Sequence, residues 1–185
     1  MTEIGIIVGS TRQNRLSPQV AAWVKGLADE RGTETYHLVD IKDYNLPLHD
    51  EPVPAALSED YQAPEATAWS ERIRTLDGFV FVTPEYNRGI PTPLKNAIDY
   101  LGSEFANKAA GIVTYGSANG QIAAAALRVS LSTLGVATVQ AQPGLSIFTD
   151  VRDFTEFTPG PQHTEPVKTL LAQVASWSTA LKTIR

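Results

Sequence analysis

Two arginines and two serines lie close together between Gly9 and Ser17, where the sequence reads GSTRQNRLS. A guanidinium can donate two parallel hydrogen bonds to phosphate oxygens, and hydroxyl and backbone N–H groups add further donors. An apolar run precedes this segment and a helix-like stretch follows it, so the donors would gather at a helix N-terminus. The sequence has neither G-x-G-x-x-G nor G-x-x-x-x-G-K-[ST], which favours a terminal monophosphate over a pyrophosphate or triphosphate. An ordinary turn with solvated Arg12 and Arg15 is the alternative.

A second unusual segment runs from Thr83 to Pro93 and reads TPEYNRGIPTP. Pro84 makes the chain rigid where an apolar run ends, and an acid, an aromatic ring and an amide follow it directly. A heteroaromatic ligand needs such a set, because it packs on a flat surface and exchanges hydrogen bonds at its rim. The alternative is a proline-rich connection in which Tyr86 is a surface ring and Glu85 is solvated.

A third segment, Tyr115 to Gly120, reads YGSANG and leads into an alanine-rich helix. Small residues such as Gly116 and Ser117 would let backbone N–H groups and the helix dipole approach a ligand closely. Donors fixed there would stabilise negative charge on a ligand. A simple glycine turn would look the same. The pattern is not the G-x-S-x-G elbow of an α/β-hydrolase, because Ser117 follows Gly116 directly.

The elements that position these segments alternate between strand and helix, which predicts an α/β fold with one parallel sheet and helices on both faces. Five strands favour the order 2-1-3-4-5, in which a crevice opens where the loops after strands 1, 3 and 4 meet. The length of 185 residues suits a single domain spanning 1–185. We expect strands at 4–8, 34–41, 78–83, 109–115 and 137–145, and helices at 18–30 (capped by Ser17), 65–76, 93–101, 120–134 and 165–182.

Composition excludes several other functions. There is no cysteine, so neither a thiolate nucleophile nor a Cys-ligated metal is available. The net charge of −5 without a Lys/Arg cluster argues against nucleic acid, and no apolar run is long enough for a membrane span. We therefore expect a cytoplasmic protein. His49-Asp50-Glu51 is not predicted as a metal site, because consecutive residues rarely converge on one ion. No protein residue is assigned as a catalytic acid, base or nucleophile, and His163 has no identifiable partner.

Together, GSTRxxRLS and TPEYNRGIPTPLKNAIDYL resemble the NADPH-dependent FMN reductase family of the flavodoxin-like fold, over roughly residues 3 to 145. The resemblance implies a three-layer sandwich that binds FMN and passes hydride from NADPH or NADH to a small acceptor such as a flavin, quinone or azo compound. It implies that the first loop holds the FMN phosphate and that the second lines the isoalloxazine ring. Many members have serine and asparagine where this chain has Arg15 and Pro18-Gln19. The implied phosphate residues are Ser10, Thr11, Arg12, Arg15, Leu16 and Ser17, and the ring residues are Pro84, Glu85, Tyr86 and Asn87, to which Gly116 and Ser117 are added.

The resemblance also implies a homodimer or a tetramer of dimers. Two apolar stretches, Tyr44 to Leu48 and Ile90 to Leu94, support this expectation, because loops rarely expose such residues without a partner. The alternative function is a flavodoxin-like electron carrier without substrate turnover, which the two arginines and the modest net charge disfavour. The missing glycine fingerprint disfavours a nicotinamide-binding dehydrogenase. The irregular segment 146–163 contains three phenylalanines, Phe148, Phe154 and Phe157. They predict that the segment is a lid or an interface, or that their rings pack against the last helix.

Overall fold

The computed structural model describes all 185 residues and contains a parallel sheet of the predicted order β2-β1-β3-β4-β5. Its strands are β1 (Glu3–Val8), β2 (Thr35–Asp40), β3 (Gly78–Pro84), β4 (Ala109–Gly116) and the short β5 (Ala137–Thr138). The predicted fifth strand, 137–145, is wrong as one continuous element. It divides into β5 and β6 (Gly144–Ser146), both paired with β4. Pro143 lies between them and has no N–H to donate to the ladder.

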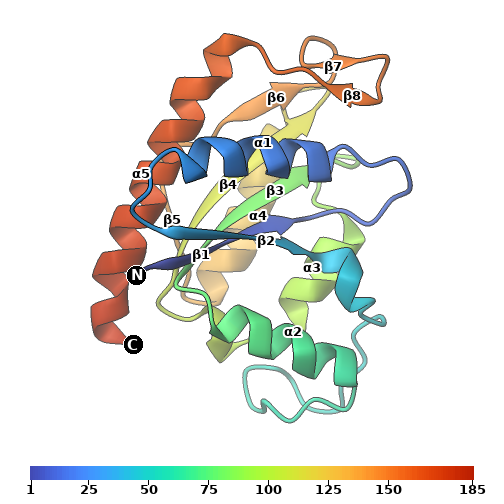
Figure 1. Cartoon of the computed structure of the whole chain (residues 1–185). Helices are drawn as coiled ribbons and strands as arrows, with labels where there is room; N and C mark the ends of the chain where they lie inside the picture. Colours follow the sequence, from blue (N-terminus) through green and yellow to red (C-terminus); the bar gives the residue numbers. More distant parts are fainter.

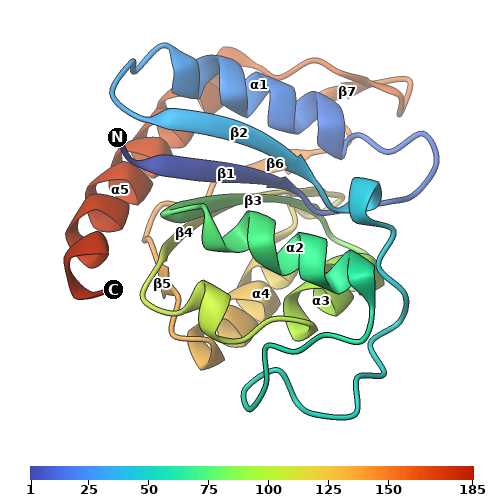
Figure 2. The same ribbon diagram turned by 60° about the horizontal axis from the view of Figure 1, so that its bottom comes forward.

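Helices cover both faces of the sheet, as Figures 1 and 2 show. One face carries α1 (Ser17–Asp29) and α5 (Thr164–Leu181), and the other carries α2 (Pro64–Arg74), α3 (Thr92–Asp99) and α4 (Gln121–Thr133). Short 3-10 turns occur at Ile41–Tyr44 (η1), Ser103–Phe105 (η2), Pro161–His163 (η3) and Lys182–Ile184 (η4). Within 146–163 the chain forms a small hairpin of β7 (Val151–Arg152) and β8 (Glu156–Phe157), which the sequence did not indicate. None of the helices has the length and apolar character that a bilayer crossing requires.

The two central strands, β3 and β4, are buried at every position, which explains their nearly unbroken apolar sequences. Alternate residues face opposite layers, so Val80 and Val82 pack toward α1 and α5, whereas Phe79 and Phe81 pack toward the other three helices. The expectation that Ile90 to Leu94 is exposed is wrong at Leu94, which is fully buried in the second of these layers. The residue belongs to the amphipathic face of α3 rather than to a free loop.

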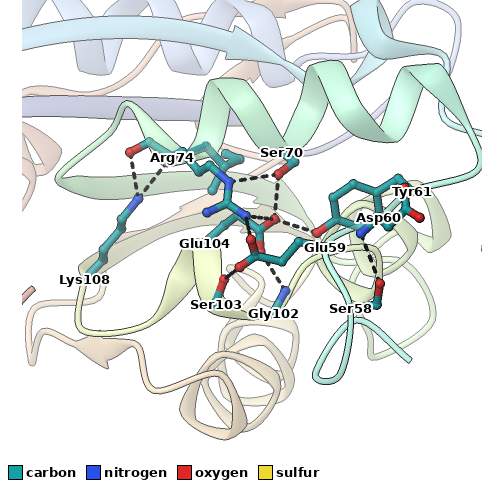
Figure 3. Close-up of polar contacts among 11 residues, drawn as sticks. Ser58, Glu59, Asp60, Tyr61, Ser70, Arg74, Gly102, Ser103, Glu104 and Lys108 are labelled. Atoms are coloured by element: carbon teal, nitrogen blue, oxygen red, sulfur yellow. Dashed lines mark hydrogen bonds and ion pairs between the residues drawn. The ribbon is translucent and has the colours of Figure 1, made fainter. Parts of the chain in front are cut away.

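One of the ties between the fold and the long connection from η1 to α2 is the buried carboxylate of Glu104 in η2. Figure 3 shows the donors around it: the Tyr61 hydroxyl at 2.5 Å, the Ser70 hydroxyl at 2.6 Å, the Arg74 guanidinium at 3.1 Å and the Gly102 N–H at 3.0 Å. Burial alone would raise the pKa of Glu104, but the hydrogen bonds to its charged form lower the pKa below the ordinary value. This acid therefore has a structural role.

A buried lysine stands at the same end of the sheet, just before β4. The Lys108 ammonium donates to the carbonyl of Ile73 at 2.7 Å, where α2 ends, and lies 5.5 Å from the centre of the Phe79 ring. Figure 3 shows its side chain pointing at the end of that helix. Burial lowers the pKa of Lys108 to about 8. Both perturbed groups lie at the amino end of β4, opposite the carboxyl ends where the sequence predicts a site.

Candidate functional site

A cleft of about 360 Å³ opens at the carboxyl ends of β1, β3 and β4. All three predicted loops contribute to it, as the order of the sheet requires. Ile147 and Phe154, from the segment after β6, close one side. The lining residues are Arg12, Leu16, Pro84, Glu85, Tyr86, Tyr115, Gly116, Ser117, Ile147 and Phe154.

A larger hollow of about 620 Å³ lies at the opposite end of the sheet but is less suited to a ligand. Its charged groups neutralise one another, since Asp77 accepts from Lys182 at 2.7 Å and from Arg185 at 2.9 Å. The cleft at the carboxyl ends instead contains a cation and backbone donors without partners in the chain.

The loop between β1 and α1 has the properties of an anion cradle. The backbone N–H groups of residues 10–16 donate to no acceptor in the chain. Arg12 is exposed at the wall of the cleft and has neither an ion pair nor a hydrogen bond within the chain. Consecutive free N–H groups before a helix N-terminus, together with a free guanidinium, are what a phosphate group needs.

Arg15 has a different partner from the one that the sequence suggested. Its guanidinium donates to both carboxylate oxygens of Asp40 at the end of β2, at 2.8 and 2.5 Å, and also to the carbonyl of Ser10. Both side chains of the ion pair are largely buried. The two-bond geometry expected for a phosphate is thus present, but a carboxylate of the protein occupies it and fixes the loop to β2.

Beneath the loop, three hydroxyl groups form a buried chain. The Ser10 and Ser17 hydroxyls lie 2.8 Å apart, and the Ser17 hydroxyl lies 2.7 Å from that of Tyr115. The prediction that Ser17 caps α1 is therefore wrong: the cap position is Leu16, and no side chain bonds the helix N-terminus. Burial raises the pKa of Tyr115 to about 12, so its hydroxyl is a neutral donor. Sequence reasoning missed Tyr115, although its place at the end of β4, directly before Gly116, was a usable signal.

The loop after β3 forms a tight two-residue turn. Tyr86 and Gly89 exchange both backbone hydrogen bonds, at 2.9 and 3.0 Å, and the central residues Asn87 and Arg88 have φ of 50° and 65°. Pro84 is buried at the floor of the cleft and Tyr86 is partly exposed at its wall, as expected for a surface that packs on a flat ring. Asn87 lies on the turn and does not line the cleft.

Glu85 lines the cleft, and its carboxylate also caps the N-terminal end of α4. Its carboxylate accepts the N–H groups of Ile122 and Ala123 at 2.9 and 3.0 Å, and its side chain is only 7% exposed. The expectation that the positive end of this helix faces a ligand is therefore wrong, because a carboxylate already occupies it. The backbone N–H groups of Ser117 and Ala118 remain free for a ligand at this side.

The remaining predicted residues separate into two groups. Leu16, Gly116 and Ser117 line the cleft, whereas Thr11 lines a different hollow beside η1 and α3. Gly116 packs tightly against Glu85, because a Cβ at Gly116 would lie 3.2 Å from the Cβ of Glu85. Ile147 and Phe154 were not assigned to the site, although the phenylalanines of this segment were noted.

The sheet order and the helices on both faces define a flavodoxin-like fold, with a cleft at the carboxyl ends of its strands. The family model of the NADPH-dependent FMN reductases matches residues 2–150. The chain belongs to this family, and the predicted class of enzyme, an FMN-dependent NAD(P)H reductase, is confirmed.

Curated relatives agree with this assignment, and a solved structure agrees with the fold. An NAD(P)H-dependent FMN reductase of Schizosaccharomyces pombe is 38% identical over 78% of this chain and 73% of its own length. A 2-hydroxy-1,4-benzoquinone reductase of a Burkholderia species is 32% identical over 80% of this chain and 72% of its own. The structure of the flavoenzyme NAD(P)H:(acceptor) oxidoreductase of Paracoccus denitrificans superposes with a TM-score of 0.68 over 99% of this chain and 98% of its own, at 21% identity. This last likeness supports the fold.

Proposed function

We propose that the cleft binds FMN with its phosphate in the loop 10–16 and that the loaded enzyme uses NAD(P)H to reduce a quinone or a free flavin. The balanced reaction for a quinone is NAD(P)H + H⁺ + quinone → NAD(P)⁺ + hydroquinone. The observation that carries the proposal is the set of partnerless N–H groups and the partnerless Arg12 beside a cleft at the carboxyl ends of the strands. The flavin supplies a centre that accepts and returns hydride.

In this proposal the protein residues bind and orient, and none transfers a proton. Arg12 and the loop N–H groups hold the phosphate, while Tyr115 orients the hydroxyl chain below it. Glu85 holds the loop after β3 against α4 and so keeps the ring end of the cleft in shape. Tyr115, whose pKa is raised by burial to about 12, does not ionise near neutral pH. The proton consumed in the reaction then comes from solvent at the open mouth of the cleft.

Two features support a planar acceptor of the quinone class. The cleft lining includes Pro84, Tyr86 and Ile147, which suit a flat apolar molecule. One relative carries the name 2-hydroxy-1,4-benzoquinone reductase, and another, from Pseudomonas putida, is named quinone reductase. We therefore infer that quinones are good acceptors for this enzyme.

The test has two parts. Equilibrium titration of the apoprotein should give one FMN per chain and much weaker binding of riboflavin, which lacks the phosphate. Steady-state oxidation of NADH and of NADPH should then be compared across 1,4-naphthoquinone, 1,4-benzoquinone, free FMN and an azo dye. Equal affinity for FMN and riboflavin would overturn the phosphate assignment, and turnover with none of the acceptors would overturn the enzymatic one.

We also propose that two copies of the chain associate, as the resemblance to the family implies. Support comes from exposed apolar side chains on the side of the sheet that carries α3 and α4, namely Leu48, Leu57, Ile122 and Val129. A hollow of about 380 Å³ between these helices adds Ala56 and Leu134 to the apolar surface. Light scattering should give at least twice the chain mass of 20.0 kDa, and a monomer at micromolar concentration would refute the proposal. Cytoplasmic location stays a prediction.

A further inference from the structure

The hairpin β7–β8 is firmly held at its base although its tip projects to the cleft. Asp150 is buried and accepts the N–H of Ser146 at 2.8 Å and a ring nitrogen of His163 at 2.9 Å. The sequence-based statement that His163 lacks a partner is thus wrong. The Gln19 side chain of α1 clamps the other strand, donating to the carbonyl of Thr155 and accepting from the N–H of Phe157, both at 2.8 Å.

Phe157 and Phe154 have opposite roles in this hairpin. Phe157 packs edge-on against Trp23 of α1, with ring centres 5.5 Å apart, and so anchors the hairpin to the core. Phe154 stands at the tip, is 63% exposed and lines the cleft. Its nearest aromatic neighbour is Phe148, at 6.4 Å between ring centres, and that ring is 66% exposed. The tip therefore places the solvent-facing ring of Phe154 at the mouth of the cleft, with the exposed ring of Phe148 beside it.

The backbone at Phe154 also has a conformation that is unfavourable for phenylalanine. The turn 152–155 closes with the Thr155 N–H on the carbonyl of Arg152 at 3.0 Å, and its central residues Asp153 and Phe154 have φ of 50° and 55°. Such a turn favours asparagine, aspartate or glycine at these positions, and a bulky residue at positive φ is strained. Both the backbone and the exposed apolar ring argue against phenylalanine here unless the ring meets a ligand.

The burial of the residues that line the cleft indicates which ligand the Phe154 ring meets. The floor, formed by Pro84, Tyr115 and Gly116, is buried, whereas Tyr86 and Phe154 are exposed. A cofactor on the floor would leave the exposed rings to face what binds above it. We propose that Phe154 is a specificity-determining residue that packs against a planar aromatic acceptor of the naphthoquinone type. This proposal rests on the proposed function of the cleft. Aromatic rings gain from such offset or edge contacts beyond simple area burial.

The experiment compares three variants of the FMN-loaded protein. Phe154→Gly removes the ring and relieves the strain, Phe154→Tyr keeps a ring, and Asp153→Gly relieves strain in the same turn while Phe154 stays. Binding is measured with 1,4-dimethoxynaphthalene, a redox-inactive molecule shaped like 1,4-naphthoquinone, through the change that it causes in the flavin spectrum. Thermal midpoints, FMN affinity and KM values for NADPH and 1,4-naphthoquinone are measured in parallel.

We expect Phe154→Gly to weaken binding of the naphthalene, and to raise the KM for the quinone, by about 5- to 20-fold. Its thermal midpoint should equal or exceed that of the wild type, and its FMN affinity and KM for NADPH should not change. Phe154→Tyr and Asp153→Gly should both bind the naphthalene like the wild type.

Three results would overturn the inference. Unchanged naphthalene binding in Phe154→Gly would show that the ring does not meet the acceptor. An equal rise in the KM for NADPH, or a loss of FMN affinity, would assign the ring to the donor or the cofactor. A lower thermal midpoint would assign it to packing. Failure of the wild type to bind FMN or oxidise NADPH would instead refute the proposed function itself, so the two failures are distinguishable.

Discussion

Arg12 and Arg15 are three residues apart, yet the structure predicts that replacing them has different consequences. Arg12 has no partner in the chain and faces the cleft, so Arg12→Ala should leave folding intact and remove one charge-assisted interaction with the FMN phosphate. Such an interaction is worth about 1.5–3 kcal/mol, which corresponds to a roughly 10- to 150-fold rise in the Kd for FMN. Riboflavin binding should hardly change. Arg12→Lys should recover only part of the loss, because the planar fork is gone.

Arg15→Ala should act mainly on stability. It removes two hydrogen bonds to Asp40 and one to the carbonyl of Ser10, and it leaves a largely buried carboxylate without its cation. A loss of about 2–3 kcal/mol is expected, or roughly 5–10 °C in thermal midpoint for a chain of this size. Asp40→Asn should cause a similar loss, and the double variant should be less destabilised than the sum of the two single ones.

The assays are urea unfolding for stability and titration with FMN and riboflavin for affinity. Asp40→Asn gives the decisive comparison, because it retains Arg15 and releases it from its partner. If Arg15 is a phosphate ligand, the freed guanidinium should strengthen FMN binding, and Arg15→Ala should lower the ratio of FMN to riboflavin affinity as much as Arg12→Ala does. That pair of results, with normal stability, would refute the structural role of Arg15.

Three further predictions concern other residues. Tyr115→Phe should weaken FMN binding by about 0.5–1.5 kcal/mol, with little effect on riboflavin, because the hydroxyl chain loses one of its three members; an equal loss for both flavins in titration would contradict a role at the phosphate. Glu85→Gln should shift the flavin potential upward by roughly tens of millivolts in spectroelectrochemistry and lower the thermal midpoint, and an unchanged potential would place the carboxylate away from the ring. Because the folded-state pKa of Lys108, about 8, lies below the unfolded value, burying its charge destabilises the fold below pH 8 and the penalty fades as pH rises. Relative to Lys108→Met, the wild type should therefore gain about 1–2 kcal/mol between pH 7.5 and 9.5 in urea unfolding, and parallel curves would contradict the shift.

Much of the fold follows from the sequence because parallel strands that are buried on both faces have distinctive apolar runs. The order of the sheet then places the loops after β1, β3 and β4 together without further information. The break between β5 and β6 was less visible, because Val139 continues the ladder before Pro143 interrupts it. The β7–β8 hairpin was missed since its turn, Asp153-Phe154, lacks the glycine that marks most such turns.

The site could be located from sequence, but the roles within it depend on partners that are distant along the chain. Arg15 looked equivalent to Arg12 until Asp40, on another strand, was placed beside it. Glu85 looked free to bond a ligand until its carboxylate was found at the start of α4. Sequence spacing shows which groups can reach a cleft, whereas competition from internal partners decides which of them stay free to bind.

The central claim is that this chain is a reductase in which a nicotinamide reaches the flavin directly. The measurement that tests it is anaerobic mixing of the FMN-loaded wild type with NADPH, and separately with NADH, while the visible absorbance of the flavin is followed. The account predicts complete bleaching by at least one nucleotide in a single two-electron step, with one nucleotide consumed per flavin. An absorbance that neither nucleotide changes, although dithionite reduces the same flavin through a stable one-electron form, would contradict it and indicate an electron carrier.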